Sequence, residues 1–246
     1  MGEVIFDDDL KERLHVFKNR FHAGELLAEM LKRNLSLEDA ILLAIPAGGI
    51  PVGYEISCRL NIPMDIVIVR KLQIPWDPEA GFGAISSDGE IVLNERLVKR
   101  LGLSEEVIEE VVEKTLRVIR DRSESFRKAK PTLSIRGKTV ILVDDGLASG
   151  YTMLAAIRSI KKKNPKRIIV AVPTASTAAV EFVSREVNKI LCLNVRSSRI
   201  FAVADAYRKW RDLADDEVVE ILKRISEGSG NDRSKIYDEP GSRYGG

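Results

Sequence analysis

Apolar residues along this chain gather in short continuous runs, and most of the segments between the runs have helical spacing. The runs are rich in Val, Ile and Leu and cover residues 40–45, 65–69, 139–143, 167–172, 189–193 and 200–203. They lack polar alternation, which is typical of buried strands covered on both faces. Strands that alternate with helices predict an α/β fold, with a parallel sheet flanked by helices.

A long amphipathic helix is predicted to begin after Ser104. This residue precedes two acidic residues, and the apolar positions from 107 to 119 then mark one face. Ser is a favoured N-cap, so we expect a helix from Ser104 to about Arg127. Its last turns are rich in Arg and Lys, which we interpret as a solvated, dipole-complementing helix end.

Residues 73–94 carry two prolines and three glycines and keep no strong period. We predict a mobile loop, followed by a short hairpin that turns at Ser87, Asp88 and Gly89. Loops of this length in compact domains are often functional. Residues 228–246 are rich in Gly and Ser, and we expect a disordered tail that leaves 1–227 as a single domain.

Composition narrows the class of protein. The chain has 246 residues, with 39 Lys and Arg against 37 Asp and Glu, a net charge of +2. So small an excess does not predict nucleic-acid or membrane-surface binding. Prolines and glycines interrupt the most apolar stretch, 40–54, and the start of the chain is acidic, so we expect a cytoplasmic protein. Cys58 and Cys192 have no CxxC spacing and are interpreted as small core residues.

The candidate chemistry is concentrated after the run 139–143. Asp144 and Asp145 follow it directly, and a turn rich in Gly and hydroxyl groups then leads into an amphipathic helix. Free backbone N–H groups and the positive end of the helix dipole converge at such a junction, which suits a phosphate. Ser149 and Thr152 add hydroxyl donors. Two carboxylates would repel a phosphate, so we expect them to face ribose hydroxyls, a metal ion or both.

This passage closely resembles the phosphoribosyl pyrophosphate (PRPP) motif of type I phosphoribosyltransferases: four apolar residues, two acids, then Ser-Gly-x-Thr. The resemblance implies that Asp144 and Asp145 hold the 2- and 3-hydroxyls of ribose. It also implies that a five-residue loop wraps the 5-phosphate, formed by Ala148, Ser149, Gly150, Tyr151 and Thr152. The alternative is a strand-to-helix turn of an unrelated doubly wound protein, such as a phosphoacceptor or a nucleotide-binding domain.

A second strand-to-helix turn, at Ala47, Gly48 and Gly49, looks like the pyrophosphate loop of the same family. Glycines there supply unhindered N–H donors for an anion, although a plain structural turn is the alternative. Relatives often carry Arg where Ala47 stands. We therefore expect Arg70 and Lys71 to supply the positive charge for pyrophosphate.

Weaker similarities extend the resemblance over about residues 15–225, toward a subgroup of bacterial and archaeal phosphoribosyltransferases of unassigned base. The family implies a small hood formed by about 1–38 and 195–227, a lid at 73–81 and a homodimer. From the lid, Trp76 or Glu79 would act on the reactants, with packing on the base of the loop as the alternative for Trp76. Tyr207 in the hood would stack on the base, with a core position as the alternative.

The implied activity is transfer of the 5-phosphoribosyl group from PRPP to a base or another small nitrogen nucleophile, with Mg²⁺ as cofactor. The catalytic residues would be Asp144, Asp145 and Lys71. The two acids lie near the cationic sugar and reach the metal indirectly, through ribose hydroxyls or water, while Lys71 lies near the leaving pyrophosphate. Hypoxanthine-guanine enzymes carry Asp where this chain has Ala148, which argues against 6-oxopurines and leaves adenine and uracil open.

Two other functions fit parts of the pattern. A PRPP-sensing regulatory or RNA-binding protein would keep the fold without turnover, but we expect no added DNA-binding domain. The basic residues of 158–167 are interpreted as a solvated helix end, so we expect no nucleic-acid or membrane partner. A phosphohydrolase or phosphoacceptor with paired aspartates would not explain the turn at Gly48.

Overall fold

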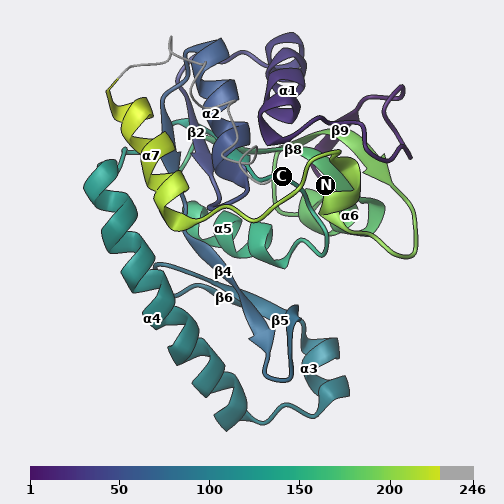
Figure 1. Cartoon of the computed structure of the whole chain (residues 1–246), viewed down its shortest axis with the longest axis vertical. Helices are drawn as coiled ribbons and strands as arrows, with labels where there is room; N and C mark the ends of the chain where they lie inside the picture. The colour runs from purple at the N-terminus through teal and green to yellow at the C-terminus, as the bar shows by residue number, and fades with distance from the viewer. Residues whose placement is uncertain (228–246) are drawn as a thin grey trace, which may run out of the picture.

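A six-stranded parallel sheet forms the centre of the molecule (Figure 1). The structure, a computed structural model, describes residues 1–227. In the strand order β1-β9-β8-β7-β2-β3, the strands are β1 (Glu3–Phe6), β9 (Lys189–Arg196), β8 (Arg167–Ser176), β7 (Thr139–Val143), β2 (Ala40–Ala44) and β3 (Met64–Ile66). The predicted α/β architecture is confirmed.

Helices cover both faces of this sheet. Residues Leu42 and Ala44 of β2 pack on the side of α1 (Arg20–Asn34) and α2 (Gly49–Leu60). Ile41 and Leu43 face the opposite side, where α5 (Tyr151–Lys161) and α6 (Thr177–Ser184) lie. Because successive side chains of a strand point to opposite faces, both sets are buried, which explains the continuous apolar runs in the sequence.

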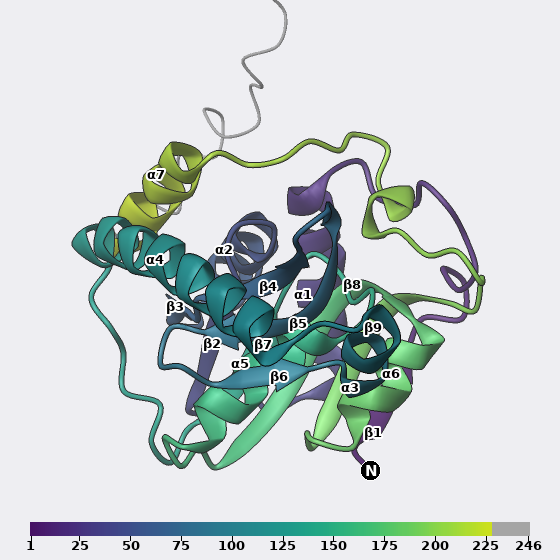
Figure 2. The same ribbon diagram turned by 90° about the horizontal axis from the view of Figure 1, so that it is seen from below.

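A second, antiparallel sheet of three strands projects from the first. It consists of β4 (Val69–Ile74), β5 (Asp77–Ser86) and β6 (Ile91–Leu93), followed by α3 (Glu95–Leu101) and α4 (Glu105–Ala129). Figure 2 shows α4 lying across this sheet, beside α7 (Asp215–Ser226). The predicted start of α4 is confirmed, since Ser104 Oγ accepts a hydrogen bond from the Val107 amide at 3.4 Å.

The expectation of a mobile loop over residues 73–94 is wrong at its start. There β4 continues to Ile74 and turns through two residues into β5, while the hairpin predicted at residues 87–89 is present. The glycines of this segment mark close approaches. A Cβ on Gly81 would lie 2.3 Å from Lys71 Cγ, and one on Gly83 would lie 2.4 Å from the Val92 carbonyl oxygen.

Other boundaries also differ from the prediction. The run 65–69 is divided, because β3 ends at Ile66 and the chain leaves the sheet before β4 begins. Residues 200–203 do not form a strand: Ile200 is 88% exposed, and a 3-10 helix, η1 (Val203–Ala206), follows. The short strand β1 was not predicted from its half-polar sequence.

The segment around Phe17, which precedes α1, meets residues 206–208 at the carboxyl edge of the main sheet. The amide of Phe17 donates to the Ala206 carbonyl at 2.9 Å, and the amide of Arg208 donates to the Phe17 carbonyl at 2.8 Å. Residues 1–38 were expected to contribute to the hood. Within them, β1 belongs to the main sheet and α1 to the helices that cover it. Within residues 1–227, no helix is both long and apolar enough to cross a membrane. The predicted tail lies outside the described residues.

Candidate active site

The loop between β7 and α5 is held in place by β8. The amide of Leu147 donates to the Thr174 carbonyl at 2.9 Å, and Ser176 donates back to Leu147 from its amide and to Ala148 from its hydroxyl, at 2.9 and 2.8 Å. Gly150 ends the loop with φ of 82°, a left-handed conformation that favours glycine. None of the described side chains caps α5, so its first amides remain available to an anion.

A cavity of about 360 Å³ opens over this loop. Its lining brings together residues that are far apart in the sequence: Lys71 and Glu79 from the antiparallel sheet, Asp144 at the end of β7, and the whole loop Ala148–Thr152. Val203 of η1 closes one side. The structure thus places one predicted acid, the predicted phosphate loop and one predicted cation around a single cavity.

The two acids at the end of β7 have different surroundings. The Asp144 carboxylate accepts a hydrogen bond from the amide of Asp145 at 2.9 Å. Burial, followed by the negative charge of Asp145, raises the pKa of Asp144 well above its ordinary value of 3.8. The carboxylate of Asp145 instead pairs with Arg20, whose Nε lies 2.8 Å from Oδ2.

Arg20, at the start of α1, connects Asp145 to Trp210 and Arg211. Its Nη1 donates to the Arg211 carbonyl at 2.8 Å, and its guanidinium carbon lies 3.9 Å from the centre of the Trp210 ring. The hydroxyl of Tyr207 donates to the backbone carbonyl of Asp145 at 2.7 Å. Arg20 falls within the range 1–38 expected for the hood, but its pairing with Asp145 was not predicted. No local pattern links two residues that lie 125 positions apart.

The turn between β2 and α2 packs directly against the acidic pair. A Cβ on Gly48 would lie 1.9 Å from Asp145 Oδ2, and one on Gly49 would lie 2.7 Å from the Val143 carbonyl oxygen. The amide of Gly49 is used within the turn, where it donates to the Ile45 carbonyl at 3.0 Å. Within residues 1–227 no bond is donated by the backbone amides of Ala47 and Gly48, and Gly48 lies directly beside Asp145.

Lys71 and Arg70 point to opposite faces of β4, because neighbouring strand residues alternate. Lys71 lines the cavity, and its ammonium donates to the Glu79 carbonyl. The charged neighbours of Arg70 are Arg122 of α4 and Asp215 of α7, and burial followed by the charge of Arg122 lowers its pKa. The structure therefore does not bring Arg70 to the cavity beside Lys71, contrary to the expectation.

Comparison with known proteins decides the family. The model of the phosphoribosyl transferase domain matches residues 12–207. The chain belongs to this phosphoribosyl transferase family. Proteins of two Mycobacterium tuberculosis strains, CDC 1551 / Oshkosh and H37Rv, provisionally named phosphoribosyl transferases, are each 34% identical over 211 residues. The match covers 86% of this chain and 47% of each relative, so the chain spans about half the length of these proteins.

A solved structure shares the fold of this chain. The crystal structure of TT1426 from Thermus thermophilus is 34% identical in sequence and superposes with a TM-score of 0.68. The similarity covers 85% of this chain and 98% of that one. The predicted resemblance to phosphoribosyltransferases is therefore confirmed at the level of family and fold.

Two further expected site residues of this phosphoribosyl transferase domain lie in contrasting positions. Trp76 is at the tip of the β4–β5 hairpin and is 64% exposed. Tyr207 is only 2% exposed and packs against the rings of Phe17 and Trp210, with centroids 5.4 and 5.1 Å away. Tyr207 thus occupies the core position that was the alternative to base stacking, since its ring presents no open face to a ligand.

Proposed function

We propose that this domain is a Mg²⁺-dependent phosphoribosyltransferase, which transfers the 5-phosphoribosyl group of PRPP to a nitrogen nucleophile and releases pyrophosphate. One observation carries the proposal: the acidic pair lies between two strand-to-helix turns that present backbone amides. PRPP has two phosphorylated ends and a diol between them. Two anion-binding turns that flank two carboxylates match that arrangement.

In this proposal the loop Ala148–Thr152 binds the 5-phosphate, through the first amides of α5 and the hydroxyls of Ser149 and Thr152. The fixed geometry of the loop supports this role, because β8 holds Leu147 and Ala148 before any ligand arrives. The carboxylates of Asp144 and Asp145 accept hydrogen bonds from the ribose hydroxyls. Pairing with Arg20 keeps Asp145 in position for this contact.

The pyrophosphate group faces the turn Ala47–Gly49 and Lys71. The ammonium of Lys71 lies at the cavity, where it balances negative charge that develops on the leaving group. The tip of the β4–β5 hairpin, with Trp76 and Glu79, closes over the reactants and limits access of water. Glu79 already lines the cavity, and Trp76 is exposed at the edge of the same hairpin.

The donor set fits magnesium. Among the described residues, no three His, Cys, Asp or Glu side chains gather into a metal-binding group. Magnesium commonly takes one or two carboxylates and completes its shell with water and substrate phosphates. Asp144 and Asp145 would hold the ion indirectly, through ribose hydroxyls or water. When bound, it supplies positive charge to the leaving pyrophosphate.

The acceptor is a base or another small nitrogen nucleophile. Ala148 supports an acceptor other than a 6-oxopurine, because its methyl group offers no hydrogen bond to a purine nitrogen. Adenine and uracil remain the bases to test first, together with simple amines.

The decisive assay measures pyrophosphate release from PRPP and Mg²⁺ with a panel of purines, pyrimidines and amines.

Binding of PRPP is measured separately by calorimetry, for the wild type and for Thr152→Val. Loss of one charge-assisted hydrogen bond should weaken PRPP binding in the variant by about 1 to 3 kcal/mol. Thr177→Val, the same change at a partly buried threonine of α6 that does not line this cavity, serves as the control. Acceptor-dependent release supports the enzyme. PRPP binding without release favours a sensor, and wild-type affinity in Thr152→Val contradicts the assigned cradle.

A further inference from the structure

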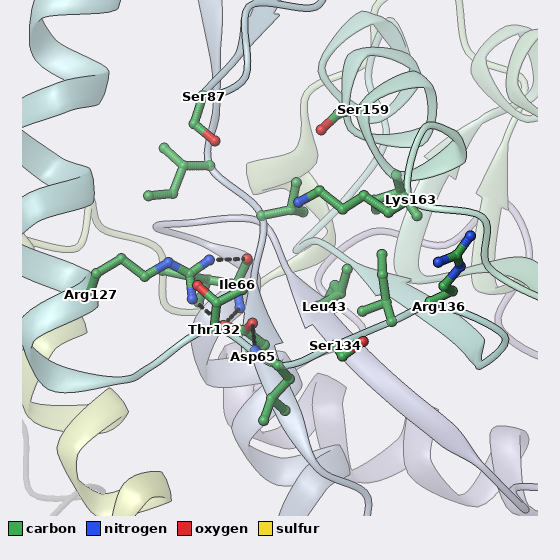
Figure 3. A pocket seen from close by; sticks show the side chains of 15 residues that line it. Leu43, Asp65, Ile66, Ser87, Arg127, Thr132, Ser134, Arg136, Ser159 and Lys163 are labelled. Atoms are coloured by element: carbon green, nitrogen blue, oxygen red, sulfur yellow. Dashed lines mark hydrogen bonds and ion pairs between the residues drawn. The ribbon is translucent and has the colours of Figure 1, made fainter.

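A second cavity, of about 330 Å³, lies at the other end of α5 (Figure 3). It is bounded by β3, the end of α5 and the linker that joins α4 to β7, and it shares no lining residue with the cavity at Asp144. The intervening helix has 11 residues, which at 1.5 Å per residue separates the two cavities by about 16 Å.

One wall of this cavity is fixed by a buried carboxylate. Asp65 is 2% exposed and accepts hydrogen bonds from the amides of Ile66 and Leu133, at 2.7 and 2.8 Å. Arg127 pairs with Asp65 and donates to the Ile66 carbonyl at 3.0 Å. These bonds tie the linker and α4 to β3, so the cavity is formed without a ligand.

The rest of the lining combines an apolar floor with donors at the rim. The floor consists of aliphatic side chains from β2, the β3–β4 connection, the linker and α5, among them Leu43, Ile135 and Ile160. The rim carries the hydroxyls of Ser87, Thr132 and Ser134. An apolar floor with a few convergent polar groups is typical of small-molecule sites, and the volume is at the lower end of their usual range of about 300–1,000 Å³.

The cavity also holds positive charge that the fold does not neutralise. Arg127 is balanced by Asp65, but within residues 1–227 neither Lys163 nor Arg136 forms an ion pair. Figure 3 shows the ammonium of Lys163 extending across the cavity, with no bond to the other residues drawn. Asp88 lies outside the lining and is occupied by hydrogen bonds from Ser86 and Ser159, although it feels the charge of Lys163.

We propose that this cavity binds a small phosphorylated molecule. Its phosphate would contact Lys163, whose ammonium extends into the cavity, and a hydroxyl of the rim, which are donors that recognise phosphate oxygens. Its organic part would lie on the aliphatic floor. Val67 and Ile68 form part of the lining and connect the two sheets, so the ligand would contact the segment that joins them.

The test is a titration of the ¹⁵N-labelled full chain with inorganic phosphate, at constant ionic strength maintained with sodium chloride. Amide shifts are followed by residue. Those of Ser87, Ser134 and Lys163 should saturate along one curve, and those of Ser149 and Thr152 along a separate curve. Lys163→Glu should raise the apparent dissociation constant of the first curve at least tenfold and change that of the second less than twofold.

Lys166→Glu is the matched control, since it makes the same charge change at an exposed lysine nearby that does not line the cavity. It should change the apparent dissociation constant of the first curve less than twofold. The proposal is overturned if the amides around Lys163 do not shift, if their shifts do not saturate, or if Lys166→Glu weakens them as much as Lys163→Glu. Failure of the Ser149 and Thr152 amides alone would count against the proposed function and not against this cavity.

Discussion

The carboxylate of Asp145 is surrounded so closely that a single methyl group can displace it. Arg20 lies on one side at 2.8 Å, Gly48 lies on another, and the Tyr207 hydroxyl fixes the backbone of the same residue. Small changes at these neighbours would therefore shift the carboxylate that we propose binds ribose.

Gly48→Ala tests this crowding. Gly48 has φ of −61°, so alanine brings no backbone strain, but its Cβ would lie 1.9 Å from Asp145 Oδ2. We expect the carboxylate to move, the Arg20 pair to weaken and the affinity for PRPP to fall at least tenfold, or by about 1.4 kcal/mol. Calorimetry measures the affinity, and thermal unfolding confirms that the variant folds. Wild-type affinity in a folded variant would contradict this prediction.

Asp144 predicts a pH dependence of stability. Burial and the charge of Asp145 raise its folded pKa above the ordinary 3.8, so the folded state holds this proton more tightly than the unfolded state. Stability from this group is therefore greatest below pH 3.8 and falls as the pH rises through the folded pKa. Asp144→Asn stays neutral, and its unfolding free energy at pH 7 should exceed that of the wild type by about 1 kcal/mol or more.

Urea unfolding at several pH values measures this difference, which should shrink toward pH 4. Asp121→Asn, at an exposed position on α4, controls for the loss of one negative charge. An advantage of Asp144→Asn that stays constant with pH would contradict the assigned cause.

At the scale of elements, the junction of the phosphate loop with α5 depends on glycine. Gly150 and Gly102 both have positive φ, 82° and 63°, so alanine at either position costs about 1 kcal/mol of backbone strain. At Gly150 the new Cβ would also lie 3.0 Å from Val183 Cγ2, whereas nothing lies within 4 Å at Gly102. Urea unfolding should show Gly150→Ala as the more destabilising change. Equal losses would mean that the packing of α6 on this loop adjusts freely.

The hairpin tip makes a prediction about the lid. Trp76 is 64% exposed, so Trp76→Ala should change the unfolding free energy by less than about 0.5 kcal/mol. If the tip excludes water from the reactants, the variant should hydrolyse PRPP faster relative to transfer. The ratio of ribose 5-phosphate to transfer product measures this effect. Ile200→Ala, at an 88% exposed position, is the control and should leave the ratio unchanged.

Local sequence was sufficient to predict the elements that hold the phosphate loop. The run 139–143, the loop and α5 follow one another without a gap. A continuous apolar run predicts the strand, glycine predicts the loop, and helical spacing predicts the helix. The sequence could not show that Gly81 and Gly83 permit close strand pairing, because that role depends on Lys71 and Val92 across the sheet. The pair of Arg20 with Asp145 was missed for the same reason.

At the scale of the whole molecule, the helices on both faces of the central sheet bury its side chains. Cys192 lies within β9, is fully buried, and its pKa is raised to about 12 by burial. At pH 8 its thiol is therefore protonated as well as inaccessible, and we expect modification only on global unfolding. Cys58 of α2 is partly exposed. Mass spectrometry after alkylation should find Cys58 labelled first. Rapid labelling of Cys192 in the native protein would contradict this order.

The contacts that Arg20 and Asp145 make with residues 207–211 form late during synthesis of the chain. Asp144 and Asp145 emerge from the ribosome long before Tyr207 and Trp210, which complete the surroundings of Arg20. A nascent chain that stops at residue 200 has the whole central sheet but lacks the hydroxyl that fixes Asp145 and the ring that covers Arg20. We therefore expect such a chain to bind PRPP more weakly than the full chain, even though its strands can already pair in register.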